Sequence, residues 1–454
     1  MSKFNSTSHK SVNNLAGGKA YVLSKEIELA HSVLTTFLNN KFYESGDERI
    51  ERIRNLIQQC DPKFVAKLAV LTRQEFNLRS INHVLLGELS KIDNTYVREA
   101  TIASIVRPDD ILEIIAYCDG KLSKQLQRGL RRSLYKFSPY QLAKYKSQRK
   151  KVKLVDAFNM LHPNPKFASD EQANAWKLLI KGELKNTETW ESDIQLIPKL
   201  IKENKMPYMA LLRNLNNIIK YKWDEIIPDV CKRLTDEKAI LNSRQLPFRF
   251  WTAYKNVTGN IALTDAIVKA AEISLKNVPR FEGKTLVAID TSGSMMGRPI
   301  TIASLFGASL ARSNHADLIL YDTDMQDVKF STLSTIIELA EKIQSLAKGG
   351  GTNTALVFEH ARDKYDRIII LSDNESWVSN AQQAYKTYIP KDVFVYCIDI
   401  QGYGTTDVRG DNVFHIPGWS NAMFELIKVF DTGNGIVDYI YDYDYQKFID
   451  FKYK

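Results

Sequence analysis

Apolar residues recur at spacings of three and four through the first part of the chain, from about Ser24 to Leu275. The stretches "ERIRNLIQQC", "FVAKLAVLTRQEF" and "QLQRGLRRSLYKF" follow this spacing, and the strict alternation of apolar and polar residues that marks strands is scarce there. A recurrence of three to four residues is typical of amphipathic helices that bury one face. The pattern therefore predicts a helical module built from many short helices.

The breaks between these helices carry helix-start signals. Asp61 and Ser138 each stand directly before a proline, and a capping oxygen followed by proline is favoured at the first turn of a helix. Short helices joined by short connections indicate stacked helical hairpins. Their spacing is compatible with HEAT-like repeats of about 40–47 residues, although it is irregular.

The pattern changes at "NVPRFEGKT", from Asn277 to Thr285. Beyond it, the apolar runs "TLVAID", "ADLILYD", "DRIIILSD" and "DVFVYCIDI" alternate with helical segments. Near-continuous apolar strands separated by helices are typical of an open, mostly parallel α/β sheet. The tail is rich in Asp and Tyr, and its pattern leaves open whether it is a docked edge strand or a loosely held peptide. We therefore expect four parts: a polar segment (1–20), a helical module (21–283), an α/β domain (284–432) and the tail (433–454).

Length and composition fit this division. A chain of 454 residues is long enough for two or three domains. No apolar run approaches the ~20 residues that cross a bilayer, and the polar N-terminus is unlike a signal peptide. The cysteines are widely spaced and form no CxxC, which favours buried thiols over disulfides or a zinc site: Cys60, Cys118, Cys231 and Cys397. We therefore expect a cytoplasmic protein without a membrane segment.

The charge is distributed unevenly between the two halves. Residues 1–283 contain 46 Lys and Arg against 31 Asp and Glu, a balance of +15, whereas the rest of the chain contains 16 against 22, a balance of −6. Together they give the net charge of +9. The basic half is therefore the one expected to meet a polyanion.

Oxygen-bearing side chains follow several of the predicted strands. The stretch "AIDTSGS" supplies Asp290, Ser292 and Ser294, "GGGTNT" supplies Thr352, and "LSDNES" supplies Asp373. The carboxyl ends of parallel strands share one edge of a sheet, where ligands of α/β proteins bind. Carboxylate and hydroxyl oxygens without His or Cys suit Mg²⁺ or another hard divalent cation. The alternative is a hydrogen-bonded turn without a metal.

Catalytic signatures are missing around this cluster. "GGGTNT" lacks the GK[ST] of a phosphate-binding loop, and no G-x-S-x-G element contains Ser294. A metal-assisted nuclease is disfavoured as well, because two-metal nuclease sites need more carboxylates than Asp290 and Asp373 supply. We expect a protein that is not an enzyme.

The strongest basic signal lies between Lys121 and Lys153, where twelve Lys and Arg occur without an Asp or Glu. The helical spacing of Arg128, Arg131 and Arg132 predicts one broad cationic face, with Tyr135 placed to stack on a base. The following segment concentrates further cations, Lys144, Lys146, Arg149 and Lys150 among them. This density favours a nucleic acid backbone over an ordinary solvated face.

Two resemblances sharpen these expectations. The five oxygen-bearing residues resemble the metal-ion-dependent adhesion site of von Willebrand factor A domains, which implies that Ser292, Ser294 and Thr352 bind one divalent cation directly. The segments "LAKYKSQRKKVKLVDAFNMLHPNPK", "MPYMALLRNLNNI" and "SRQLPFRFWTAYK" are similar to the TROVE module of the Ro autoantigen family, bacterial type. This family implies a multidomain α and α/β fold, in which a ring of HEAT-like helical repeats is closed by a Rossmann-like von Willebrand factor A domain.

The Ro resemblance also implies site residues and partners. The segment from Lys144 to Arg149 and His162 match the family's RNA-contacting segment. Arg213 and Arg249 lie within matching motifs, and the alternative for these two is that they bridge neighbouring repeats. The implied function is non-catalytic binding of Y-like small noncoding RNA and of single-stranded 3′ ends of misfolded or partly degraded RNA. The implied partners are an exoribonuclease similar to polynucleotide phosphorylase and an acidic protein group at the cation. The alternative is a metal-dependent protein-interaction scaffold that binds no RNA.

Overall fold

The computed structural model describes residues 11–35, 45–145, 151–185, 193–243, 245–331, 333–417, 424, 426–427 and 435–450. The chain forms two compact units, which are described separately. One consists of residues 46–194 and 437–454, and the other of residues 1–45 and 195–436. Within the described residues, no helix combines the length and the apolar character needed to cross a membrane.

The first unit is a stack of short helices. They are α2 (Gly46–Gln59), α3 (Pro62–Gln74), α4 (Arg79–Leu89), α5 (Tyr96–Ser104), α6 (Pro108–Tyr117), α7 (Lys124–Ser133), α8 (Pro139–Tyr145), α9 (Leu154–Leu161) and α10 (Asp170–Ile180). The predicted starts are confirmed, because the Asp61 side chain accepts from the Lys63 N–H at 2.8 Å and the Ser138 hydroxyl accepts from the Gln141 N–H at 3.3 Å. Each cap satisfies a backbone donor that the first helical turn leaves unpaired.

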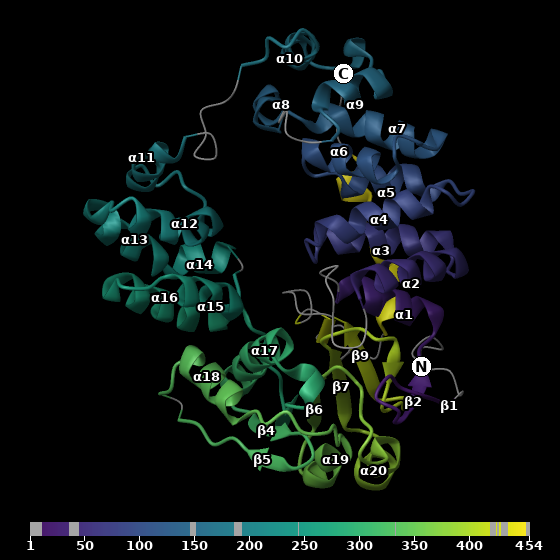
Figure 1. Cartoon of the computed structure of the whole chain (residues 1–454), viewed down its shortest axis with the longest axis vertical. Coiled ribbons are helices and arrows are strands. Elements are labelled where there is room, and N and C mark those ends of the chain that lie inside the picture. Colours follow the sequence, from purple (N-terminus) through teal and green to yellow (C-terminus); the bar gives the residue numbers. More distant parts are fainter. Residues whose placement is uncertain are drawn as a thin grey trace. The chain divides into compact units, whose positions relative to one another are not determined.

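These helices pack in two layers, as helical hairpin repeats do. Helix α5 packs between α3 and α7 in one layer, while α4 packs against α6 in the other, and the stack is visible in Figure 1. The apolar faces predicted from the spacing of three and four fill the space between the layers; Leu68, Leu85 and Leu130 are fully buried there. The helical-repeat prediction is therefore confirmed for this unit.

The tail completes the same unit instead of forming a strand. Helix α22 (Ile436–Asp442) lies against α3, where the rings of Phe64 and Tyr441 approach to 5.4 Å. The Lys67 ammonium donates to the backbone carbonyl of Tyr443 at 2.9 Å, and the Tyr443 hydroxyl donates to Glu75 at 2.8 Å. The tyrosines of the tail thus serve to dock it on the helices.

The second unit joins further helices to an α/β domain. The helices are α11 (Ile197–Lys202), α12 (Tyr208–Lys220), α13 (Ile227–Leu234), α14 (Glu237–Ser243), α15 (Pro247–Asn256) and α16 (Ile261–Ser274). Helix α15 packs on α17 (Arg298–Asn314), and α16 packs on α18 (Ile336–Leu346). The ion pairs Arg312–Glu272 and Lys255–Glu341 tie these layers together.

The α/β domain contains a six-stranded sheet in the order β5-β4-β3-β6-β7-β9. Its strands are β3 (Thr285–Asp290), β4 (Asp317–Tyr321), β5 (Met325–Asp327), β6 (Arg367–Ser372), β7 (Phe394–Asp399) and β9 (Val413–Pro417). All neighbours are parallel except β4 and β5. The predicted Rossmann-like, mostly parallel sheet is therefore confirmed.

Helices cover both faces of this sheet. Leu286 and Ala288 point to the core that α19 (Ala355–Ala361) and α20 (Ala381–Tyr388) form on one face. The alternate residue Ile289 faces α17, where Gly307 leaves room for its side chain. Strands buried on both faces have no polar alternation, which is why they appear as unbroken apolar runs in the sequence.

The N-terminal segment packs on the α/β domain. Strand β1 (Ser11–Asn13) pairs with β2 (Lys19–Val22), which pairs with β8 (Thr405–Thr406), and α1 (Lys25–Leu34) lies against β9. A buried hydrogen bond joins His31 Nδ1 to Asp399 Oδ2 at 3.1 Å. The described N-terminal segment thus packs on residues that are distant in sequence, as the described tail does in the other unit.

Candidate functional site

The carboxyl edge of the sheet gathers the five predicted cation-binding residues. Asp290 ends β3, Ser292 and Ser294 follow it in a short turn, Thr352 precedes α19, and Asp373 follows β6. Parallel pairing of β3 with β6 aligns their carboxyl ends, so that the residues after both strands meet. All five side chains are buried, with at most 6% of their surface exposed.

Hydrogen bonds fix the Asp290 carboxylate at this edge. The Ser292 N–H donates to one of its oxygens at 2.8 Å, and the Ser372 hydroxyl donates to the other at 2.6 Å. The Ser292 and Ser294 hydroxyl oxygens lie 3.4 Å apart. Ser372, which the sequence analysis did not select, thus acts as a positioning residue.

Backbone contacts hold Thr352 at the same edge. The Gly293 N–H donates to the Gly350 carbonyl, and the Gly349 N–H donates to the Thr291 carbonyl, both at 3.0 Å. Gly349 has a φ of 79°, a conformation that favours glycine. On the other side, the Trp377 N–H donates to the Thr352 carbonyl at 3.1 Å. Backbone hydrogen bonds therefore join the loop before α19 to the loops that follow β3 and β6.

Two buried carboxylates, those of Asp290 and Asp373, repel each other at this edge. Burial and the charge of Asp290 raise the pKa of Asp373 well above its usual range, and burial raises the pKa of Asp290 to about 6. One carboxylate oxygen of Asp373 is buried without any hydrogen-bond partner in the described structure. A divalent cation would offset both charges and would fill this missing contact, so the residues fit one.

Asp322 also belongs to this edge, and the sequence analysis missed it. It follows β4, which pairs with β3, and its charge contributes to the raised pKa of Asp290. The signal was available, because "YDTD" places an acid after a predicted strand in the same way as "AIDTSGS". In the part of the chain that the structure describes, no group of three His, Cys, Asp or Glu could hold a metal. A cation here would therefore depend on the hydroxyls.

The basic stretch is divided by the fold. Arg128 is exposed on α7, whereas Arg131 and Arg132 are half-buried. The Arg131 guanidinium donates to the Leu161 carbonyl at 2.5 Å, so it connects α7 to the end of α9. His162 follows directly and is exposed, in a left-handed conformation with φ 47°. Arg131 and His162 are thus brought together, and Arg131 has a structural contact of its own.

The remaining predicted residues of this stretch have different outcomes. Lys144 is half-buried near the end of α8, with its ammonium 5.8 Å from the ring centre of Tyr145. Lys146, Arg149 and Lys150 lie outside the described residues.

The prediction that Tyr135 stacks on a base was wrong. Its ring is buried against Trp176, and its hydroxyl is bonded to the backbone of Asn164, because this face of the helix packs on the next repeat.

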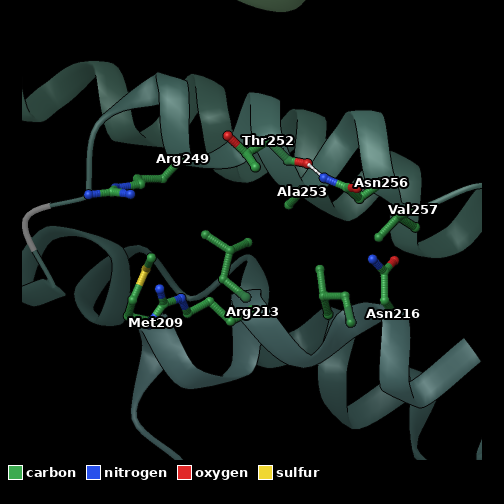
Figure 2. A pocket seen from close by; sticks show the side chains of 10 residues that line it. Met209, Arg213, Asn216, Arg249, Thr252, Ala253, Asn256 and Val257 are labelled. Carbon is green, nitrogen blue, oxygen red and sulfur yellow. Dashed lines mark hydrogen bonds between the residues drawn. The ribbon is translucent and has the colours of Figure 1, made fainter. Parts of the chain in front are cut away.

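Arg213 and Arg249, predicted from separate motifs, line one pocket of about 240 Å³ (Figure 2). Arg213 lies on α12 and Arg249 on α15, and both are exposed to solvent. Partial burial and the charge of Arg213 lower the pKa of Arg249. No carboxylate is among the described residues that line the pocket. Two neighbouring cations with no carboxylate among these lining residues have the charge that suits an anionic group.

Comparison with known proteins identifies the family. The model of the TROVE domain matches residues 19–195 and 171–277, which is more than half of the chain. The chain belongs to the TROVE domain family. The crystal structure of the Ro protein of Deinococcus radiodurans matches this TROVE protein with a TM-score of 0.60 over 88% of this chain and 99% of that chain. At 18% sequence identity, this likeness shows a shared fold. The predictions of a TROVE module and of a Ro-like fold are therefore confirmed.

Curated relatives match shorter parts. This TROVE protein is 22% identical to telomerase protein component 1 of Rattus norvegicus over 303 residues, and 27% identical to an uncharacterized protein of Methanocaldococcus jannaschii over 198 residues. These matches cover 46% and 41% of this chain. The chain spans only 12% of the rat protein and 51% of the archaeal one. The similarity therefore concerns a module that occurs in proteins of different size.

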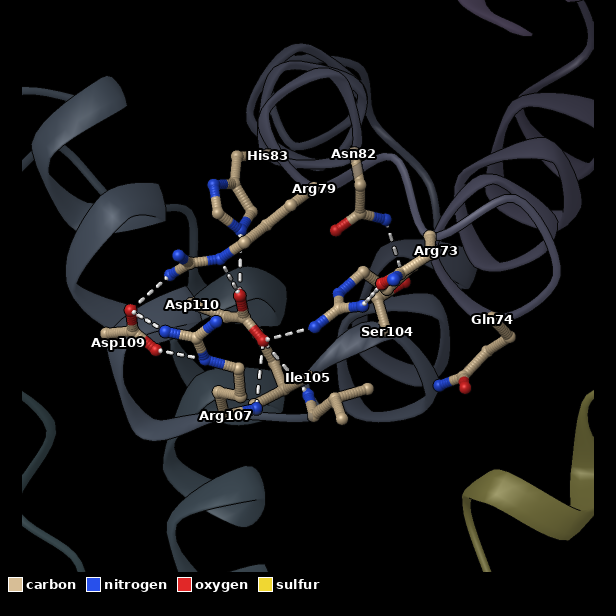
Figure 3. A network of polar contacts seen from close by, with 12 residues as sticks. Arg73, Gln74, Arg79, Asn82, His83, Ser104, Ile105, Arg107, Asp109 and Asp110 are labelled. Atoms are coloured by element: carbon tan, nitrogen blue, oxygen red, sulfur yellow. Dashed lines mark hydrogen bonds and ion pairs between the residues drawn. The ribbon is translucent and has the colours of Figure 1, made fainter. Parts of the chain in front are cut away.

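The TROVE module also contains a buried ion network (Figure 3). Asp110 at the start of α6 accepts from Arg73 at 3.3 Å and from Arg79 at 2.5 Å, and it lies 3.3 Å from His83 Nε2. Burial alone would raise the pKa of Asp110. The hydrogen bond with His83 and the charges of the two arginines outweigh burial and hold the pKa well below its usual range. This network joins α3, α4 and α6, so its role is structural.

Proposed function

We propose that this TROVE-family protein is a non-catalytic RNA-binding protein of RNA quality control or decay. It binds Y-like small noncoding RNA and the single-stranded 3′ ends of misfolded or partly degraded RNA, and it works in the cytoplasm with a nuclease such as polynucleotide phosphorylase. Family membership supports RNA as the ligand. The observation that carries the proposal is the pocket of Arg213 and Arg249, because two neighbouring guanidinium groups without a carboxylate suit RNA phosphates.

The basic surface of α7 to α9 supplies a second contact region in this proposal. Lys121, Lys124 and Arg128 are exposed on or beside α7, and His162 is exposed after α9. Structured RNA is recognised chiefly through its backbone and shape, for which an exposed cationic surface is sufficient. Passage of a single strand through a ring of repeats, which the Ro resemblance implies, belongs to the same proposal.

A binding measurement with the purified full chain tests the proposal. Fluorescence anisotropy with a labelled 12-nucleotide RNA that has a free 3′ end should give a salt-dependent Kd. Replacing Arg213 and Arg249 together by Ala should weaken binding, while Lys220→Ala, which removes a cation of the same helix outside the pocket, should change it little. Equal affinity of the double variant and the natural protein would refute the proposed site.

The carboxyl edge of the sheet has a separate role in this proposal. Asp290, Ser292, Ser294, Thr352 and Asp373 would hold one Mg²⁺, with the two aspartates acting directly or through water. The bound cation supplies an electrophilic position that an acidic oxygen of a partner protein can occupy. The unpartnered oxygen of Asp373 and the all-oxygen composition support this assignment.

A protein-interaction scaffold is the second candidate, and one observation favours it. Met296, Trp377 and Val378 are exposed hydrophobic residues, between 37% and 54% accessible, and they surround the loop that holds Thr352. An apolar rim beside a cation suits a protein partner with an acidic residue next to apolar ones. RNA binding and the scaffold role are separated by Asp290→Ala, which should leave RNA affinity unchanged and should abolish a cation-dependent protein contact.

A further inference from the structure

The turn between β1 and β2 closes on itself through Asn14. The Asn14 N–H donates to the Gly18 carbonyl at 2.8 Å, and the Gly17 N–H donates to the Asn14 carbonyl at 3.0 Å. The Asn14 side-chain oxygen accepts from the Gly18 N–H at 2.7 Å. Gly17 has a φ of 88°, which favours glycine. These bonds fix the shape of the turn and leave the Asn14 amide nitrogen for a contact outside it.

That contact is made with the loop after β6, residues 373–378. The Asn14 Nδ2 donates to the Ser376 carbonyl at 2.8 Å. Gly18 packs on the same carbonyl so closely that an added Cβ atom would overlap its oxygen. Asn14 and Ser376 are at most 6% exposed, so water competes little for their hydrogen bond. The turn and the loop thus meet without room for a side chain at Gly18.

Glu375 of the same loop supplies a second contact. Its carboxylate accepts from the Ala16 N–H at 3.1 Å and from the Thr405 hydroxyl at 3.2 Å. Thr405 belongs to β8, which pairs with β2, and Glu375 is fully buried. A buried acceptor that loses its donors costs free energy, so these bonds favour one position of the loop.

This loop also determines where two residues of the cation edge lie. Asp373 is its first residue. The Thr352 carbonyl accepts from the Ser376 hydroxyl at 3.2 Å, from the Trp377 N–H at 3.1 Å and from the Val378 N–H at 3.2 Å. The Thr352 hydroxyl is attached to the backbone that these bonds hold. A neutral hydroxyl is useful to a cation only if it is already in position, because ligand geometry depends on the surrounding groups.

We propose that the turn of residues 14–18 is a positioning element of the cation edge, which raises the affinity for the divalent cation by holding the loop of Asp373 against Thr352. The inference rests on the proposed cation site and adds a part of the chain that contributes no ligand to it. Asn14 and Gly18 act through Ser376. Replacing groups that orient metal ligands typically lowers metal affinity by about 10- to 100-fold.

Binding of Tb³⁺ to the full chain provides the readout. Tb³⁺ takes oxygen ligands as Mg²⁺ does, and its emission is excited by energy transfer from a nearby tryptophan. Trp377 lies beside the loop of Thr352, because a Cβ atom added to Gly351 would be 2.7 Å from the Trp377 ring. Displacement of Tb³⁺ by Mg²⁺ then gives the affinity for Mg²⁺.

Two variants remove the contact from different sides. Asn14→Ala deletes the donor to Ser376, and Gly18→Ala places a methyl group against the Ser376 carbonyl. Each should weaken Tb³⁺ and Mg²⁺ binding by about 10-fold, the lower end of the range for groups outside the ligand set. Asn13→Ala is the matched control, since Asn13 is the exposed neighbour of Asn14 in β1, and it should bind both ions as the natural protein does.

The outcomes separate this inference from the cation site itself. Tb³⁺ binding that is lost in Asp373→Asn but unchanged in Asn14→Ala and Gly18→Ala would keep the site and overturn the role of the turn. An equal loss in Asn13→Ala would overturn it too, because the effect would then not depend on the contact with the loop. A natural protein without Tb³⁺ emission would overturn the site and the role of the turn together. Circular dichroism in EDTA gives the folded fraction of each variant, and a loss of affinity that only follows unfolding would refute positioning.

Discussion

Two regions of this protein place like charges side by side, and they differ in burial. At the carboxyl edge of the sheet, Asp290 and Asp373 are at most 1% exposed, and burial raises the pKa of both. In the α12–α15 pocket, Arg213 and Arg249 are open to solvent. Burying two carboxylates away from water costs free energy unless a cation binds between them. Water screens the repulsion between the two exposed arginines. The first arrangement therefore suits a resident ion, and the second suits an anionic ligand that binds and leaves.

The ion network of Asp110 is the reference for this comparison, since the protein supplies its own counter-charges there. We expect Asp110→Ala to have the largest effect, a loss of about 3–5 kcal/mol in the free energy of unfolding, because Arg73 would lose its buried carboxylate and Arg79 would keep only Asp109. Urea unfolding followed by circular dichroism measures it. A loss below about 1 kcal/mol would mean that water replaces the carboxylate.

The same network predicts a pH dependence. The pKa of Asp110 is lowered in the folded protein, so its contribution to stability is complete above the unfolded pKa of about 3.9 and is lost as pH falls through the folded pKa. The difference in unfolding free energy between the natural protein and Asp110→Asn should be constant from pH 7 to pH 5 and should shrink below pH 4. A difference that stays constant to pH 3 would contradict the assignment.

The exposed pair should give the next largest effect. Removing both Arg213 and Arg249 should weaken single-stranded RNA binding by about 10- to 100-fold, as expected for the loss of charge-assisted contacts worth about 1.4–3 kcal/mol. Asp290→Ala should leave the affinity unchanged. An equal loss in Asp290→Ala would mean that the two regions are coupled, and the contrast between them would then no longer hold.

Mg²⁺ should stabilise the folded protein through the buried pair, Asp290 and Asp373. Adding Mg²⁺ at about 100 times its Kd should stabilise the protein by about 2.7 kcal/mol and raise the Tm by several degrees. Asp373→Asn should remove this response. The variant should unfold no earlier than the natural protein in EDTA, because it relieves the repulsion between two buried carboxylates. A Mg²⁺ response that persists in Asp373→Asn would place the cation elsewhere.

The smallest expected effect concerns the salt dependence of RNA binding. Each phosphate contact with a single strand contributes about −0.7 to the slope of log affinity against log salt. Arg213→Ala should therefore make the slope less steep by about 0.7, whereas Lys220→Ala, which removes a cation outside the pocket, should leave it unchanged. This result would distinguish a phosphate contact inside the pocket from a general effect of the cations on α12.

The sequence predicted the arrangement of the oxygen-rich edge better than that of the basic surface, for a local reason. Asp290 and Asp373 each end an unbroken apolar run, and parallel strands necessarily bring such ends together. Tyr135 lies on a helix that has neighbours on several sides. The helical spacing of the residues around it does not show which side the next repeat covers. Arg131 shows the same limit, because its contact with Leu161 depends on the packing of α7 against α9.

The sequence by itself determined the family, the helical repeats, the parallel sheet and the oxygen-rich edge, because periodicity and strand ends are local properties. Only the tertiary structure decided that Arg213 and Arg249 share a pocket, since α13 and α14 separate their helices along the chain. It also decided that the N-terminal segment packs on the α/β domain and that the tail packs on the first helices. Contacts between distant segments depend on which apolar faces meet in the folded chain, and no local pattern encodes that choice.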